Sequence, residues 1–211
     1  MERTMNLKHI RQKLNEINNG ALEQQAQHIS ELLVNYPHLH CELMKKTPTT
    51  DQNFRCFAYA LDVHENIEIG TNAEILFQES GSGWRGLADL LEDQKLAWVQ
   101  SSKYQDGDIC FYFDNEISED TDYDVHQLHE LGAKHAGRVV GKYIHSKWGN
   151  GHVWKHDFDI VPSDYENKNG EISVLYFRPI ATNEEIEKFL LSFYLSKPTS
   201  YTFRPKTIRI C

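Results

Sequence analysis

The order in which two kinds of hydrophobic spacing follow one another constrains the fold of this chain most. Up to about residue 105, apolar side chains recur every three or four positions, which is typical of helices packed on one side. From residue 107 onward the apolar segments are short, aromatic and β-branched, which is typical of strands. Helices followed by a run of strands, without regular alternation, predict an α+β fold with an antiparallel sheet.

Helical spacing is clearest near the N-terminus. One apolar face predicts a helix over 6–18, and another predicts a helix over 21–35, which Pro37 prevents from continuing. We expect these two helices to form a hairpin. Helical spacing returns over 87–98, and a short helix is expected over 183–195, where an asparagine cap precedes two glutamates.

Segments in the second half of the chain are typical of strands. The sequence "GDICFYF" (107–113) is short and aromatic, and "ISVLYFRP" (172–179) is a strong strand that a proline ends. Between them, 135–149 has the pattern of two strands around a turn at Gly141 and Lys142. An antiparallel sheet built from these segments is the expected core.

The chain is expected to have three parts. Residues 1–45 form an N-terminal helical hairpin, either an appendage or a lid, and 46–182 form the core. Residues 183–211 form a C-terminal helix and tail packed on that core. No repeat or long linker requires a second domain.

Charge and hydropathy argue against some classes of function. The net charge of the 211 residues is −9, so a nucleic-acid binder, which needs a basic face, is not expected. No apolar run is long enough to cross a membrane, and the N-terminus lacks the apolar segment of a signal peptide. The expected location is the cytoplasm, or outside the cell after export without a conventional signal peptide.

Cys56 is the cysteine whose position points to chemistry. It lies in "FRCFAYALDVHE" (54–65) near the expected start of a helix, where unpaired N–H groups favour a thiolate and stabilise an oxyanion. From the residues alone, Cys56 is either a buried helix cysteine or a nucleophile. None of the four cysteines belongs to a C-x-x-C pair, so four free thiols are expected, and a zinc site of the usual spacing is not.

His135 is the candidate base for such a nucleophile, because it opens a strand just after a loop. The group that would orient its ring depends on the hairpin turn. With a two-residue turn at 141–142, His135 faces Trp148, and Ser146 shares its face of the sheet. A three-residue loop moves His145 onto that face instead, and the sequence leaves both registers open.

Four segments of the chain together resemble the core of a known family. The segments "CFAYAL", "GDICFYF", "HAGRVV" and "YIHS", in that order, resemble the core of the NlpC-type and CHAP-type cysteine hydrolases of the papain-like group. The resemblance covers about 53–178. It implies a papain-like core, in which a nucleophile-bearing helix packs on an antiparallel sheet and Gly107–Asp108 opens the next strand.

The same resemblance implies roles for individual residues. Cys56 would be the nucleophile, His135 the base and His145 the residue that orients the base. The chain departs from the NlpC type, which usually has Asp-Cys-Ser-Gly where this chain has Arg-Cys-Phe-Ala (55–58), and the CHAP type prefers an acid or asparagine as third member. Substrate specificity is therefore not carried over.

The resulting hypothesis is a cysteine peptidase or amidase that cleaves an amide bond. The Cys56 N–H would be one oxyanion donor and Asn53 a candidate for the second, while Trp148 and Trp154 would line a substrate groove. No metal or organic cofactor is needed. Neither "GHVWKH" (151–156) nor "HQLHELGAKH" (126–135) predicts a metal site, because the first lies among glycines and strand-like residues and the second follows an acidic loop.

Substrate and alternatives stay open. By the resemblance, peptidoglycan peptides come first, cleaved by a bacterial effector delivered through a dedicated export route. A peptidase or deamidase acting on host proteins, or an acyltransferase, would use the same Cys–His pair. The alternative from another class is a non-catalytic binding or regulatory protein that retains the scaffold and binds a protein partner through its N-terminal helices.

Overall fold

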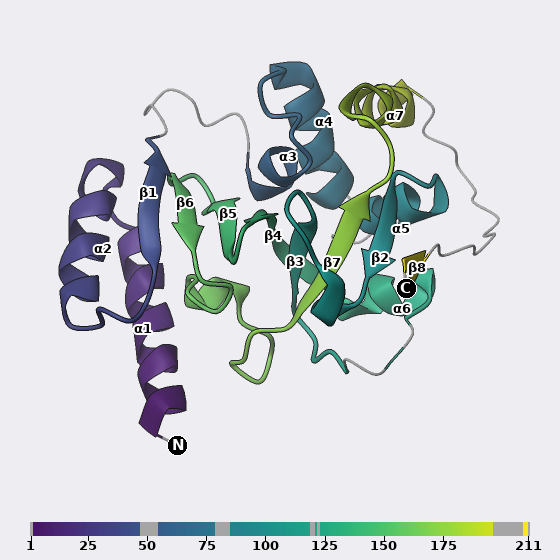
Figure 1. Ribbon diagram of the computed structural model, residues 1–211. Coiled ribbons are helices and arrows are strands. Elements are labelled where there is room, and N and C mark those ends of the chain that lie inside the picture. Colours follow the sequence, from purple (N-terminus) through teal and green to yellow (C-terminus); the bar gives the residue numbers. More distant parts are fainter. Residues whose placement is uncertain are drawn as a thin grey trace.

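An antiparallel sheet with helices on both faces forms the body of the protein (Figure 1). The computed structural model describes residues 2–46, 55–78, 85–118, 121, 123–195 and 209–210. The strands are β1 Cys41–Lys45, β2 Leu96–Val99, β3 Ile109–Phe113, β4 Ala133–Val140, β5 Tyr143–Lys147, β6 Val153–His156, β7 Val174–Pro179 and β8 Arg209–Ile210. The helices are α1 Glu2–Asn18, α2 Gln25–Val34, α3 Cys56–Ala60, α4 Ile67–Gln78, α5 Arg85–Glu92, α6 Val125–Leu131 and α7 Asn183–Leu195, with 3-10 turns η1 Leu22–Gln24, η2 Ser101–Lys103 and η3 Ser163–Tyr165. The predicted α+β class is confirmed.

The strands lie in the order β1-β6-β5-β4-β3-β7-β2-β8. The pairs from β1 to β2 are antiparallel, and the short β8 pairs with β2 in parallel. Strands β3, β4, β5 and β6 follow one another as a meander. The expected antiparallel sheet is therefore present, and β7 separates this meander from β2.

The β4–β5 hairpin has the two-residue turn that was one of the two alternatives. Val140 pairs with Tyr143, and Gly141 has a φ of 62°, which suits a glycine in a tight hairpin turn. Arg138 consequently pairs with His145. This register decides which side chains of β5 share a face with His135.

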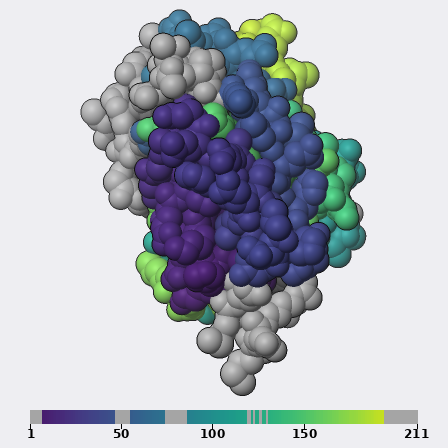
Figure 2. All heavy atoms as spheres, turned by 90° about the vertical axis from the view of Figure 1, so that its left-hand side faces the viewer, coloured from purple at the N-terminus to yellow at the C-terminus, as the bar shows by residue number. Residues whose placement is uncertain are grey.

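Alternate residues of the strands point to opposite faces of the sheet and belong to two separate apolar clusters. We call these the first-face cluster and the second-face cluster. On β3, Phe111 and Phe113 belong to the first-face cluster, which α3, α4, α5, α6 and α7 cover. Cys110 and Tyr112 belong to the second-face cluster, which α1, α2 and η3 cover. From the side of the N-terminal helices, α1 and α2 form a continuous layer over the molecule (Figure 2).

The N-terminal segment contributes more than the predicted helical hairpin. After α2 the chain forms β1, a strand that the sequence analysis missed, and β1 joins the sheet beside β6. Cys41 pairs with His156, and Leu43 pairs with Trp154. The segment therefore supplies both an outer strand and a layer over the second face.

The helix predicted over 87–98 is wrong in its second half. Helix α5 ends at Glu92, and Leu96–Val99 forms β2. Gln94 has a φ of 55°, and the Lys95 amide donates to the carbonyl of Leu90 at 2.7 Å, which closes the helix. All four residues of β2 are buried. An apolar run buried on both faces has no period that separates strand from helix, which explains the error.

None of the described helices is long and apolar enough to cross a membrane.

Candidate active site

Helix α3 begins at Cys56, and the sequence analysis predicted a helix start near this residue. The preceding Arg55 has extended backbone angles and makes no side-chain capping bond. Cys56 is 6% exposed and belongs to the first-face cluster, where α3 packs against β4 and β5. The thiol therefore sits at the first turn of a short helix held against the sheet.

His135 is fully buried on β4, not facing an open cleft. It pairs with Tyr112, and its ring stacks on Tyr165 with 3.9 Å between ring centroids and 6° between ring planes. Neither ring nitrogen has a hydrogen-bond partner in the part of the chain that the structure describes. Burial lowers the pKa of His135 well below its usual value, and the nearby His156 lowers it further, so the imidazole is neutral at pH 7.

Tyr165 is the residue that lies beside both candidates. His135 shares the face of Tyr112, whereas Cys56 packs with the first-face cluster, so the imidazole and the thiol belong to different faces of the sheet. Burial raises the pKa of Tyr165, and the nearby Cys56 raises it further. The Gly149 main chain hydrogen-bonds to the same phenol group. Tyr165 thus stacks on His135 and lies near enough to Cys56 for the thiol to affect its pKa.

His145 does not share a face with His135. Arg138 pairs with His145, and Arg138 lies three residues after His135 on a strand whose side chains alternate. Burial lowers the pKa of His145, and Lys155 lowers it further. The structure does not bring His145 to the His135 ring, so the role implied for His145 does not fit this register. Ser146 occupies the required face, as expected for a two-residue turn.

Ser146 belongs to a buried hydrogen-bonded pair that sequence reasoning missed. Its hydroxyl lies 2.7 Å from Nε2 of His156, and Nδ1 of His156 lies 2.8 Å from the carbonyl oxygen of Asp157. A carbonyl only accepts, so Nδ1 carries the proton and Nε2 accepts from the Ser146 hydroxyl. Burial lowers the pKa of His156 to about 4, which keeps the ring neutral. The signal for this pair was the alternation of "VWKH", which places His156 on the face of Trp154.

Trp148 and Trp154 line no exposed groove. Both are buried in the second-face cluster and stack on each other with ring centroids 5.3 Å apart. Neither indole N–H has a hydrogen-bond partner among the described residues. The substrate role predicted for these two side chains therefore becomes a packing role in this conformation. Asn53, the candidate oxyanion donor, lies outside the described residues.

Asp108, the acidic residue of the predicted "GD" segment, makes contacts that hold parts of the fold together. Its carboxylate accepts two hydrogen bonds from Arg178, each 2.9 Å long, and one from the amide of Gln105. Asp108 is almost fully buried. The pair therefore joins the start of β3 to the end of β7.

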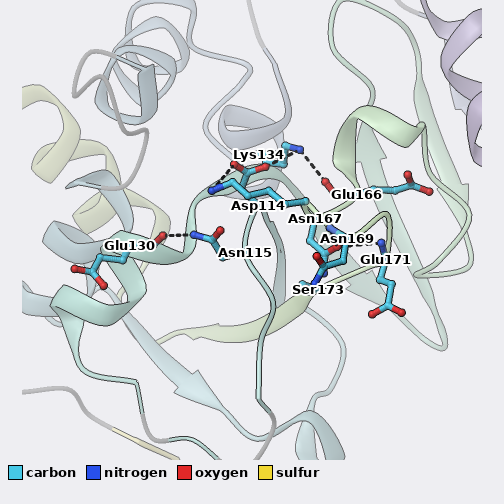
Figure 3. Close-up of polar contacts among 10 residues, drawn as sticks. Asp114, Asn115, Glu130, Lys134, Glu166, Asn167, Asn169, Glu171 and Ser173 are labelled. Carbon is cyan, nitrogen blue, oxygen red and sulfur yellow. Dashed lines mark hydrogen bonds and ion pairs between the residues drawn. The ribbon is translucent and has the colours of Figure 1, made fainter.

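The turn that carries Tyr165 is fastened from several directions. The Lys134 ammonium donates to the Glu166 carbonyl at 2.7 Å and lies 2.9 Å from the Asp114 carboxylate (Figure 3). In the following turn, the Asn167 side chain donates to Ser173 and accepts from two main-chain amides. These contacts fix the segment immediately after η3 against β4.

A pocket of about 260 Å³ is lined by residues other than the candidate catalytic groups. It is bounded by residues on β7 and the adjoining loops: Ser101, Glu116, Ile117, Phe158, Glu171, Ile172, Ser173, Val174 and Tyr176. Neither Cys56 nor His135 lines it. Within the described ranges, no group of three or more histidine, cysteine, aspartate or glutamate side chains is arranged to hold a metal ion.

Comparisons with protein-family models, with curated proteins and with solved structures found no match to this chain.

Proposed function

We propose that this protein is a papain-like cysteine hydrolase that cleaves an amide or related acyl bond, with Cys56 as nucleophile and His135 as base. The observation that carries the proposal is the position of Tyr165, whose ring stacks on His135 and whose pKa is raised by burial and then by the nearby Cys56. The order of elements supports it. A helix opened by a cysteine packs on β4 and β5, and His135 lies near the start of β4.

The proposed chemistry starts from a neutral imidazole. Because burial keeps His135 neutral, its ring can accept a proton in the resting site. His135 takes the Cys56 proton as the thiol attacks the substrate carbonyl, then gives that proton to the leaving amine. Water then hydrolyses the thioester, and the Cys56 amide at the start of α3 donates to the oxyanion.

Ser146 replaces His145 as the proposed third group. It lies on the His135 face of the sheet and is itself fixed by His156. The substrate class proposed is a peptide, with peptidoglycan peptides first. Deamidation or acyl transfer uses the same two reacting groups and differs only in the leaving group or the acceptor.

Thiol labelling is the direct test of this proposal. In a Cys211→Ser background, iodoacetamide at pH 7.5 is expected to label Cys56 much faster than Cys41 or Cys110, read by peptide mass spectrometry. Burial raises the pKa values of the Cys41 and Cys110 thiols, which leaves them almost no thiolate. Equal labelling of all three cysteines would remove the basis for a nucleophile at Cys56.

Activity is tested with peptidoglycan fragments and with a panel of peptides, by watching for new amines or for loss of ammonia. Cys56→Ser should abolish turnover, and Cys110→Ala, which changes a buried cysteine on the other sheet face, should retain it. Unchanged substrates with both the wild-type protein and Tyr165→Ala, which removes the ring stacked on His135, would count against a hydrolase.

One observation favours a second candidate function, a non-catalytic binding or regulatory protein. His135 is fully buried, Cys56 nearly so, and no hydrogen bond joins the two. A Cys56→Ser variant that keeps every measurable function of the wild type would select this alternative.

A further inference from the structure

The two residues that flank Tyr165 are both held by helix α1. Before it, the Asp164 carboxylate accepts a hydrogen bond from the Asn15 side chain at 2.9 Å. After it, the Glu166 carboxylate lies 3.1 Å from the Arg11 guanidinium, and both side chains are buried. Helix α1 therefore clamps η3 on either side of the tyrosine that covers His135.

The same turn is also held from the sheet. Lys134 immediately precedes His135, and its ammonium donates to the carbonyl of Glu166 (Figure 3). The residue before the candidate base is thus tied to the residue after the covering tyrosine. Any movement that lifts Tyr165 from His135 must break this contact together with those from α1.

Two observations mark the covering contact as releasable. Both nitrogens of His135 are buried without a described partner, so the closed position leaves a polar ring unsatisfied that water would satisfy on opening. The Arg11–Glu166 pair meets the distance of an ion pair, but the facing atoms Nη1 and Oε1 lack hydrogen-bond alignment. A buried pair without good alignment holds its partners less firmly than its distance suggests.

We propose that this conformation is autoinhibited: α1, acting through Asp164 and Glu166, holds Tyr165 over His135, and η3 must move before His135 reaches substrate. This inference rests on the proposed function for its biological meaning, because it describes the regulation of the same site. The device itself is a physical contact and is tested without measuring activity.

The test is carbethoxylation of histidines by diethylpyrocarbonate at pH 7, mapped by mass spectrometry, with the exposed His38 as internal reference. In the wild type, His135 should react far more slowly than His38. Asn15→Asp sets two carboxylates against each other and should speed the reaction at His135 about tenfold or more, since the reagent reaches only the open form. Gln12→Glu makes the same amide-to-acid change at an exposed site on α1 and should change nothing.

Direct removal of the cover completes the experiment. Tyr165→Ala should expose His135 to the reagent, whereas Tyr165→Phe keeps the ring and should keep His135 protected. Asn15→Asp alters a surface hydrogen bond, so it remains informative if Tyr165→Ala fails to fold. Folded Asn15→Asp protein in which His135 reacts as slowly as in the wild type would overturn the proposal.

The outcomes separate this inference from the proposed function. Faster carbethoxylation without thiol-dependent turnover would keep the clamp and reject the hydrolase. Turnover that requires Cys56, with His135 equally protected in every variant, would keep the hydrolase and reject the clamp.

Discussion

At the scale of single residues, Asp108 has a role that the family resemblance does not describe. A glycine–aspartate before a strand resembles the papain-like pattern, yet the carboxylate here binds the guanidinium of Arg178 through two hydrogen bonds. The hydrogen bonds to Asp108 also raise the pKa of the Arg178 guanidinium. The residue thus joins two strands, which gives it a structural role.

Asp108→Asn is therefore expected to lower the free energy of unfolding by about 2 kcal/mol, because it removes a buried charged hydrogen-bond acceptor. Denaturant unfolding followed by circular dichroism measures this. Asp106→Asn, which changes an exposed neighbour that accepts from the Gly141 amide, should cost less than about 0.5 kcal/mol. Equal losses in the two variants would contradict the role of the Arg178 pair.

At the scale of elements, β4 and β5 approach each other closely at Gly137. A Cβ atom at this position would lie 2.5 Å from Cγ2 of Ile144 and 2.8 Å from Cβ of Ser146. The glycine thus lets Ser146 lie close to the strand that carries His135. A side chain at 137 would push the two strands apart.

Gly137→Ala should destabilise the protein by about 2 kcal/mol through overpacking, read as a lower midpoint of denaturant unfolding. The control is Gly70→Ala in α4, where the added Cβ meets only ordinary contacts and helix propensity improves. Gly70→Ala is expected to be neutral or stabilising. A Gly137→Ala protein as stable as the wild type would show that the strands adjust freely.

The same hairpin shows which part of the candidate site could be predicted from the sequence. Hydrophobic alternation and turn residues predicted the two strands. The alternation of side chains then left two candidates, Ser146 and His145, for the residue that shares a face with His135. The choice depended on whether the turn has two or three residues, which glycine and lysine at 141–142 do not determine. Strand β1 was missed because its five residues gain stability mainly from pairing with β6, which no local pattern reveals.

At the scale of the whole molecule, His135 and His156 are buried in the neutral form on the second face. His156 has a pKa of about 4 in the folded chain, compared with 6.5 when exposed, and burial also lowers the pKa of His135. Between these pH values the unfolded chain binds protons that the folded chain does not. The contribution of these groups to the free energy of unfolding is therefore fully present above pH 6.5 and is lost as the pH falls toward 4.

For His156 alone this loss amounts to about 3 kcal/mol between pH 7 and pH 4. Denaturant unfolding at a series of pH values measures it. His156→Gln should show a shallower decline than the wild type over this range, and His38→Gln, which changes an exposed histidine, serves as the control. A wild-type protein whose stability does not change from pH 7 to pH 5 would contradict the burial of neutral His156.

The pairing of β1 with β6 also has a consequence for synthesis. Cys41 and His156 are partners although they stand 115 positions apart. At roughly 5–20 residues per second, β1 leaves the ribosome about 6–23 seconds before its partner exists. During that interval the outer strand has exposed main-chain groups and no neighbour to pair with. A nascent chain of this protein is therefore expected to need shielding of its first strand until β6 has emerged.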